Sequence, residues 1–150
     1  MQTFMPFDKM DKSVKCLDDR RLCKQRMEAL CIYRCITQYR RGWRNHPAVN
    51  MWRGYEKALA VYHNLCIEEW VKRGFNNYMT MLDIEPGLLI MPYWMKSLAF
   101  HQSHQSNLIR KDPEHYRPIF GKKVPDNLPY VWPVPLQSQK IEQARLAWRG

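Results

Sequence analysis

Apolar and polar residues recur with helical spacing in three stretches of the chain, and these stretches predict its main elements. The first covers residues 18–38, the second residues 47–73 and the third residues 97–111. Gly74 follows the second stretch, as is typical of helix C-termini, and Asp112-Pro113 disfavours a longer third helix. The pattern therefore predicts an all-α fold, a compact single-domain bundle of about three main helices with long loops rich in proline and aromatic residues.

The segments between these helices carry weaker patterns. Residues 1–15 are expected to form an extended arm, and residues 75–95 a long packed connection rather than a strand. Residues 114–135 are expected to form loops, and residues 136–150 either a tail or a short C-terminal helix. No internal repeat or Gly/Ser linker divides the chain, so residues 1–150 are expected to form one helical domain.

Charge narrows the choice of partner. The 150 residues include 24 Lys and Arg but 14 Asp and Glu, which gives a net charge of +10. An intracellular protein this basic often binds a polyanion, and nucleic acid is the leading candidate. Hydrophobic residues make up 45% of the chain, yet no apolar run approaches the roughly 20 residues that cross a bilayer. We expect a cytoplasmic monomer that binds double-stranded DNA and no membrane.

Several classes of site find no support in the sequence. The five cysteines are odd in number and include no C-x-x-C pair, so neither a disulfide framework nor a zinc framework is indicated. The motifs G-x-S-x-G, H-E-x-x-H, the P-loop and the dinucleotide fingerprint do not occur. A zinc site from His101, His104 and His115 is an alternative, but H-x-x-H without an acidic or cysteine ligand is a weak signal. We expect no metal and no other cofactor.

The first predicted helix carries the leading candidate for chemistry, Glu28. A carboxylate at the junction of a basic surface and an apolar core suits general acid/base work. The alternative is that Glu28 only pairs with Lys24 on a solvated face. Asp18 is expected to cap this helix. Glu28 shares one face with Arg21, Lys24 and Gln25, and the residues expected to face the core are Leu22, Cys23, Met27, Leu30 and Cys31.

The third predicted helix repeats short polar side chains along its length. Hydroxyls, amides and cations in this arrangement suit the oxygens of a phosphate backbone. The alternative is a polar surface helix with one histidine turned inward. The candidates on this helix are His101, Ser103, His104, Asn107, Arg110 and Lys111.

Aromatic residues also alternate with basic loops. Rings in such loops can stack on an unpaired or extruded base, although rings that anchor the loops to a helical body give the same pattern. These positions are Trp43-Arg44, Tyr93-Trp94, His115-Tyr116-Arg117 and Tyr130-Val-Trp132.

The order of several segments along the chain is similar to that of a known family. These segments are Met1-Gln-Thr-Phe-Met-Pro6, Leu17-Asp-Asp-Arg-Arg-Leu-Cys-Lys-Gln-Arg-Met-Glu-Ala-Leu30, Asn45-His-Pro-Ala-Val49, Met51-Trp-Arg-Gly-Tyr55, His101-Gln-Ser-His-Gln-Ser-Asn-Leu108, Arg110-Lys-Asp-Pro-Glu-His-Tyr116 and Leu128-Pro-Tyr-Val-Trp-Pro133. In them the chain resembles the pyrimidine-dimer DNA glycosylase family of the small phage endonuclease V type, and in particular its bacterial branch.

This resemblance implies a bifunctional glycosylase/AP lyase in which the N-terminal amine attacks the sugar C1′ and forms an imine. It also implies a glutamate that supports the sugar chemistry and the later elimination, which Glu28 matches. Members of the phage type expose a small second residue once the initiator Met is removed. Here the second residue is Gln2, whose bulk disfavours that removal. The amine of Met1, that of Gln2 and the side chain of Lys24 are therefore all candidate nucleophiles.

Taken together, these observations predict a DNA repair enzyme, a metal-independent DNA glycosylase with or without AP lyase activity. Its substrate would be a damaged or modified pyrimidine base in duplex DNA. The alternatives are a non-catalytic DNA-binding protein that recognises distorted or modified duplex and a structural, partner-binding helical protein. The candidate catalytic residues are Glu28, Met1, Gln2 and Lys24. The candidate DNA-binding residues are Arg21, Gln25, Arg26, His46, Arg53, His101, Ser103, His104, Asn107, Arg110 and Lys111.

Overall fold

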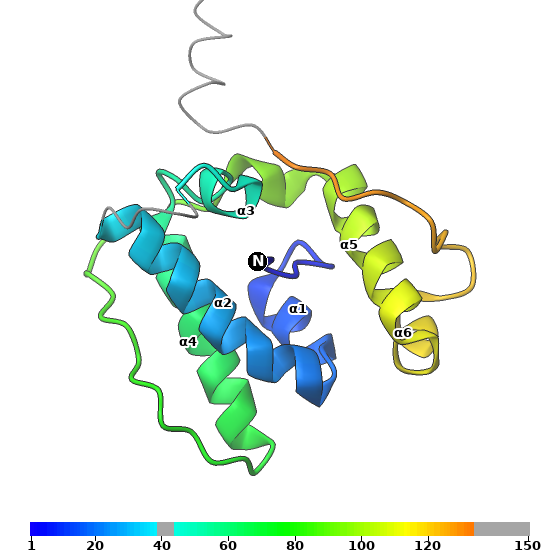
Figure 1. The fold of residues 1–150 in the computed structure, drawn as a ribbon, viewed down its shortest axis with the longest axis horizontal. Coiled ribbons are helices and arrows are strands. Elements are labelled where there is room, and N and C mark those ends of the chain that lie inside the picture. The colour runs from blue at the N-terminus through cyan, green and yellow to red at the C-terminus, as the bar shows by residue number, and fades with distance from the viewer. Residues whose placement is uncertain (39–43, 134–150) are drawn as a thin grey trace, which may run out of the picture.

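The structure is a computed structural model that describes residues 1–38 and 44–133 of the chain. The elements in chain order are α1 (Met10–Cys16), α2 (Asp19–Thr37), α3 (Pro47–Asn50), α4 (Glu56–Lys72), the 3-10 helix η1 (Tyr93–Lys96), α5 (Leu98–Lys111) and α6 (Pro113–Phe120). Figure 1 shows their arrangement. No strand occurs within the described residues, and the predicted all-α fold is confirmed.

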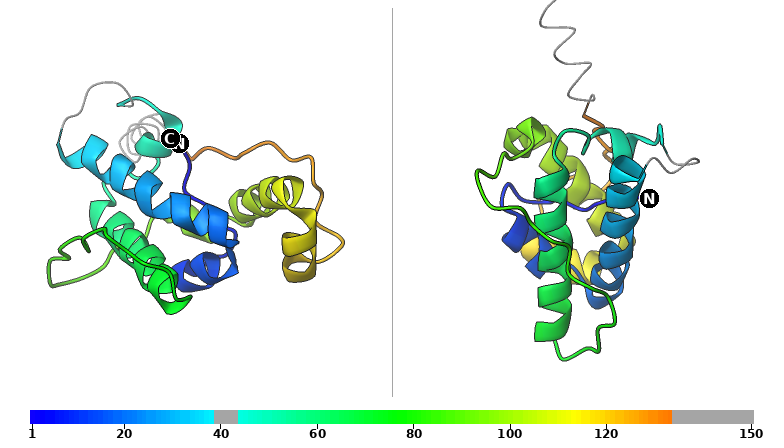
Figure 2. Two further views of the ribbon diagram at one scale, coloured as in Figure 1. Left: turned by 60° about the horizontal axis from the view of Figure 1, so that its bottom comes forward. Right: turned by 90° about the vertical axis from the view of Figure 1, so that its left-hand side faces the viewer.

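The long helices α2 and α4 pack against each other and form one side of the molecule (Figures 1 and 2). Both contribute fully buried side chains to the core, among them Leu22 and Ile32 from α2 and Leu59 and Tyr62 from α4. α5 and α6 pack together on the other side, and the first residues of the chain run between α2 and α5 (Figure 1). In the view of Figure 1 the N-terminus therefore lies between α2 and α5, and Figure 2 shows that it is at the surface of the molecule.

The first predicted helix begins where the sequence indicates. Asp18 is its N-cap, and the Asp18 side chain accepts a hydrogen bond from the backbone N–H of Arg21. The predicted core face is wrong in part, because Met27 is 59% exposed while Gln25 and Arg26 are buried. The helix is rotated so that these two polar side chains meet partners from other parts of the chain.

The second predicted helix is two helices. α3 ends at Asn50, and α4 begins only at Glu56 after a turn. Gly54 lies in that turn with φ of 87°, a left-handed conformation that an α-helix cannot contain and that glycine adopts without strain. The backbone N–H of Gly54 donates to the Glu56 carboxylate, which completes the turn. The predicted continuous helix over residues 47–73 is therefore wrong at its first third.

Two segments predicted without helix contain short helices. α1 follows the first nine residues, so only the beginning of the expected arm over residues 1–15 is non-helical. α6 lies inside residues 114–135, which were expected to form loops only. The reason is local: Pro113 occupies the first turn, where its missing N–H costs nothing, and the Asp112 side chain caps the helix by accepting from the His115 N–H.

The connection predicted over residues 75–95 has no helix or strand over residues 75–92, as expected, but its last three residues belong to η1. The expected close packing of this connection is wrong at its end, where Leu88 is 84% and Ile90 is 64% exposed. The predicted tail or short helix over residues 136–150 lies outside the described residues. Within residues 1–38 and 44–133, no helix is long and apolar enough to cross a membrane.

Candidate active site

The amine of Met1 and the carboxylate of Glu28 meet on the side of α2 that faces the start of the chain. The Met1 nitrogen lies 4.0 Å from the Glu28 Oε2 atom, which makes them an ion pair. The Met1 side chain is only 5% exposed and packs against the core, whereas the Glu28 side chain is 32% exposed. Met1 thus anchors the chain end, and Glu28 remains open to a ligand.

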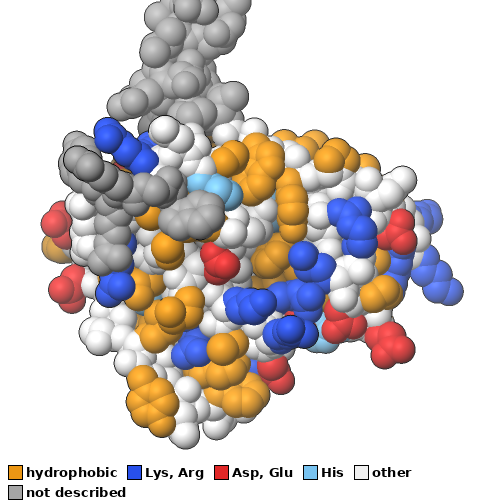
Figure 3. All heavy atoms as spheres, in the orientation of Figure 1, with side chains coloured by type: hydrophobic (Ala, Val, Ile, Leu, Met, Phe, Trp, Pro, Cys, Tyr) orange, Lys and Arg blue, Asp and Glu red, His pale blue; other side chains and the backbone are white. Residues whose placement is uncertain are grey.

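A cavity of about 320 Å³ opens beside this pair. Its walls come from the first residues of the chain, from α2, from the end of α5 and from the segment after α6. The lining residues are Met1, Gln2, Phe4, Arg20, Arg21, Lys24, Gln25, Glu28, Lys111 and Tyr130. Figure 3 shows Lys and Arg side chains gathered over the N-terminal half of α2 and towards α5. The cavity therefore combines one carboxylate, one amine and four cationic side chains.

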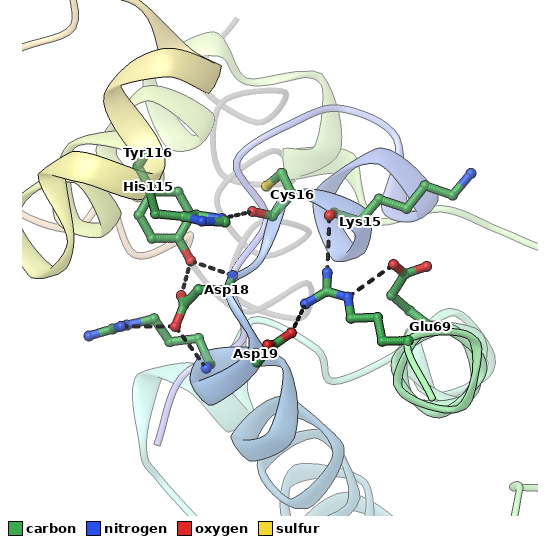
Figure 4. A network of polar contacts seen from close by, with 9 residues as sticks. Lys15, Cys16, Asp18, Asp19, Glu69, His115 and Tyr116 are labelled. Carbon is green, nitrogen blue, oxygen red and sulfur yellow. Dashed lines mark hydrogen bonds and ion pairs between the residues drawn. The ribbon is translucent and has the colours of Figure 1, made fainter. Parts of the chain in front are cut away.

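A polar network holds the start of α2, and with it the cationic side chains of Arg20, Arg21 and Lys24 that line the cavity. The Tyr116 hydroxyl donates to Asp18 and accepts from the Asp18 backbone N–H at 3.1 Å (Figure 4). Arg21 pairs with the same carboxylate at 3.2 Å. Burial raises the pKa of Asp18, but the hydrogen bond from Tyr116 and the charge of Arg21 outweigh burial and leave this pKa lowered. Asp18 is therefore a charged anchor between α2 and α6.

The junction of α1 and α2 is held from two further sides. His115 of α6 donates through Nε2 to the Cys16 carbonyl at 2.9 Å. Arg73, at the end of α4, donates to Asp19 at 2.9 Å, to Glu69 at 3.1 Å and to the Lys15 carbonyl at 3.1 Å (Figure 4 labels these partners). These contacts fix the direction of α2 and hence the position of Glu28 on it.

Of the predicted catalytic residues, the structure brings all four to the cavity. Met1, Gln2, Lys24 and Glu28 line it together. Arg20 and Phe4 also line it but were not among the predicted site residues, and Tyr130, which lines it too, was predicted only as one of the aromatic loop residues that can stack on a base or anchor a loop. Arg20 could have been found from its spacing, because Arg20, Lys24 and Glu28 follow one another at i, i+4 and i+8.

His46 lies near the same pair. Its Nδ1 atom accepts from the Ala48 N–H at 3.0 Å and so caps α3, and its ring meets Trp132 edge-on at 6.1 Å. Partial burial and the positive charge of the Met1 amine lower the pKa of His46, and the charge of Glu28 offsets part of this effect. His46 is therefore a neutral neighbour of the amine at pH 7.

The polar face of α5 lies mostly inside the protein, where it holds other segments. The Ser103 hydroxyl accepts from the Val131 N–H at 3.1 Å, and Asn107 donates to the Leu128 carbonyl at 3.1 Å. Arg110 donates to the Asp126 carbonyl at 2.7 Å. Lys111 is the predicted member of this helix that lines the cavity. The short polar residues of α5 thus fix the segment that brings Tyr130 to the site.

His101 and His104 are buried and hold the first residues of the chain. The Met5 N–H donates to His104 Nδ1 at 2.9 Å, and His101 lies 2.7 Å from both the Met5 and Met95 carbonyls. Burial, with a contribution from the charge of His101, lowers the pKa of His104 to about 3. Within the described residues, no group of three His, Cys, Asp or Glu is placed to hold a metal ion.

Three further predicted DNA contacts have partners within the protein. Gln25 is 1% exposed and binds the first residues of the chain. Arg26 donates to Asn77 at 2.8 Å and lies 4.4 Å from the centre of the Trp70 ring. Arg53 donates to Asn50 at 3.1 Å. The exposed cations around the cavity are therefore those of α2 and the end of α5.

Comparison with known proteins places the chain in a family. A family model described as Pyrimidine dimer DNA glycosylase matches residues 1–83, which is more than half of the chain. The protein therefore belongs to the pyrimidine dimer DNA glycosylase family. The match contains Met1, Glu28, α2 and α4, while α5 and the segment with Tyr130 lie beyond it. Searches of curated proteins and of solved structures gave no match.

Proposed function

We propose that this protein is a DNA repair glycosylase with AP lyase activity that acts on a damaged or modified pyrimidine base in duplex DNA. The observation that carries the proposal is the Met1 amine 4.0 Å from the Glu28 carboxylate, at the edge of a cavity lined by Arg20, Arg21 and Lys24. Membership of the pyrimidine dimer DNA glycosylase family supports a glycosylase.

The chemistry follows from these groups. The neutral Met1 amine attacks C1′ of the deoxyribose, a C1′–N bond to the protein forms, and the bond from C1′ to the base breaks as the base leaves with a proton. The C1′–O4′ bond then breaks, O4′ takes up a proton as the sugar ring opens, and the cationic imine that forms lies beside the Glu28 carboxylate, which stabilises it. Glu28 then removes a proton from C2′, and elimination breaks the bond to the 3′ phosphate. Water releases the sugar from the amine.

The nucleophile is assigned to Met1 rather than to Gln2 or Lys24. The Met1 side chain is buried against the core, so the amine is held at a fixed place next to Glu28. The amine of Gln2 would require loss of Met1, and with it loss of that anchor. Lys24 lines the same cavity, but its side chain is exposed and flexible. This assignment requires Met1 to be the first residue of the mature protein, which an intact-mass measurement determines.

Borohydride trapping on abasic duplex DNA tests the proposal directly. We expect the wild-type protein to form a covalent adduct, because borohydride reduces the imine to a stable amine. The site is located by mass spectrometry of the digested adduct, which should carry the deoxyribose fragment on the Met1 nitrogen. Salt-dependent DNA binding without any adduct would instead identify a non-catalytic DNA-binding protein. Absence of DNA affinity at low salt would contradict both.

DNA binding is expected to weaken steeply with salt. Four cationic side chains line the cavity, Arg20, Arg21, Lys24 and Lys111. If each neutralises one phosphate, affinity should fall by about 100-fold between 50 and 200 mM salt. Fluorescence anisotropy with a labelled abasic duplex measures this slope. A control variant with Lys57→Met, whose ammonium binds the Gly87 carbonyl away from the cavity, should leave the slope unchanged.

A further inference from the structure

The first residues of the chain are bound by side chains rather than by a neighbouring strand. The Phe4 carbonyl accepts from the Tyr62 hydroxyl at 3.0 Å, the Met5 N–H donates to His104, and the Pro6 carbonyl accepts from Gln105 at 2.8 Å. We call residues 1–7 the N-terminal arm. Buried backbone groups must find partners, and here two helices, α4 and α5, supply them. The position of the arm is therefore set by particular side chains.

Gln25 binds the backbone of the arm one residue from the amine. Its Nε2 atom donates to the Gln2 carbonyl at 2.8 Å, and its Oε1 atom accepts from the Phe4 N–H at 2.9 Å. The two bonds fix which way the carboxamide faces, because the donor meets a carbonyl and the acceptor meets an N–H. The Tyr62 hydroxyl also contacts Oε1, at 2.5 Å. Gln25 is 1% exposed, so water cannot replace these bonds.

The same helix carries the carboxylate. Gln25 and Glu28 are three residues apart on α2, so their side chains are neighbours on one helix face. Gln25 holds the Gln2 carbonyl, one residue from the amine, and Glu28 pairs with the amine itself. The two side chains that set the distance between the nucleophile and the carboxylate thus lie within about one turn of the same helix.

We propose that Gln25 is a positioning residue, which holds the Met1 amine at its working distance from Glu28 without touching the substrate. This inference rests on the proposed function. Catalysis by a held nucleophile depends strongly on geometry, and a displacement of about 1 Å can cost about 100-fold in rate. Loss of both bonds at Gln25 loosens the chain end, which the packing of Met1 and the hydrogen bond from Trp52 to Thr3 still restrain, while Met5 and Pro6 stay bound further along the arm.

A matched pair of variants tests this role. Gln25→Met removes both bonds with little change in side-chain volume. Gln105→Met makes the same chemical change at the Pro6 carbonyl, five residues from the amine. In single-turnover trapping at saturating abasic DNA, Gln25→Met should be about 10- to 100-fold slower than wild type, with DNA affinity within about twofold. Gln105→Met should react within about twofold of wild type, and thermal melting of both variants reports the stability that each loses.

A second readout does not depend on DNA. A limiting amount of an amine-acylating reagent labels the Met1 nitrogen, and mass spectrometry of the first peptide measures the rate. We expect labelling several-fold faster in Gln25→Met than in wild type or Gln105→Met, because the amine leaves Glu28. Tyr62→Phe, which removes the hydroxyl that contacts Gln25 and Phe4, is a milder variant and should shift both readouts in the same direction.

The possible failures are distinguishable. Equal slowing by Gln25→Met and Gln105→Met would assign Gln25 a general structural role and overturn the inference. Unchanged trapping and labelling rates in a folded Gln25→Met protein would also overturn the inference. If Gln25→Met does not fold, unchanged trapping and labelling rates in Tyr62→Phe would overturn it instead. A wild-type protein that forms no adduct overturns the proposed function, and with it the catalytic meaning of Gln25, whereas the labelling rates still report whether Gln25 holds the amine.

Discussion

Replacing Glu28 with glutamine is expected to slow strand cleavage at an abasic site by about 100- to 10,000-fold, the usual contribution of a positioned acid/base group. The amide has nearly the same shape but no charge to stabilise the cationic sugar and no basicity to take the C2′ proton. The ion pair with the Met1 amine at 4.0 Å is lost as well. Single-turnover cleavage of an abasic duplex, read on a denaturing gel, measures the effect.

DNA affinity should change little in this variant, because the cations of the cavity remain. Glu68→Gln is the matched control, since Glu68 is exposed on α4 and the change removes one negative charge in the same way. Anisotropy at a fixed salt concentration compares the two variants. Cleavage by Glu28→Gln at the wild-type rate would remove Glu28 from the proposed mechanism.

Adding one glycine before Met1 is expected to abolish covalent trapping, with a loss of at least about 100-fold. The extra residue moves the free amine by up to about 3.8 Å, which is nearly the present distance of 4.0 Å to Glu28. The nitrogen of Met1 becomes an amide and can no longer attack C1′. The variant is made by cleaving a fusion protein to leave Gly-Met1, and trapping is measured on the same abasic duplex.

The same experiment separates Met1 from Lys24. If the Lys24 ammonium were the nucleophile, the glycine extension would leave trapping intact and Lys24→Met would abolish it. We expect the opposite result: the glycine extension abolishes trapping, whereas Lys24→Met weakens DNA binding but still forms the adduct. A glycine added at the other end of the chain controls for the handling of the fusion protein.

Local signals were sufficient to predict the part of the site that lies on α2. Asp18 is a cap by residue type, and the cap sets the register that puts Arg21, Lys24 and Glu28 along one side of the helix. Those interactions span only a few residues. The family resemblance then connected Glu28 with the chain end, and the two lie 4.0 Å apart in the structure.

The rotation of α2 about its axis could not be predicted, because it depends on distant partners. Apolarity favours burial of Met27, yet Gln25 and Arg26 are buried instead. Gln25 meets the N-terminal arm, 21 residues away, and Arg26 meets Asn77 and Trp70, more than 40 residues away. A polar side chain is buried where a partner satisfies it, and a helical pattern does not contain the partner.

The histidines of α5 illustrate the same limit. Their spacing suggested phosphate contacts or, less strongly, a metal, and both side chains instead hold the Met5 backbone, 96 to 99 residues earlier in the chain. The helix break at Gly54 was also missed, since a glycine within an apolar helical pattern is compatible with a continuous helix until its φ is known.

The separation between the N-terminal arm and α5 has a consequence for how the protein is made. At about 5 to 20 residues per second, synthesis needs several seconds after the first residues to reach α5, and His104 and Gln105 cannot bind the arm before then. During that interval the first nitrogen is open to every enzyme that trims or acylates new chains. We therefore expect the bulk of the Gln2 side chain, which disfavours removal of Met1, to help decide the chemical state of the amine before the fold can protect it.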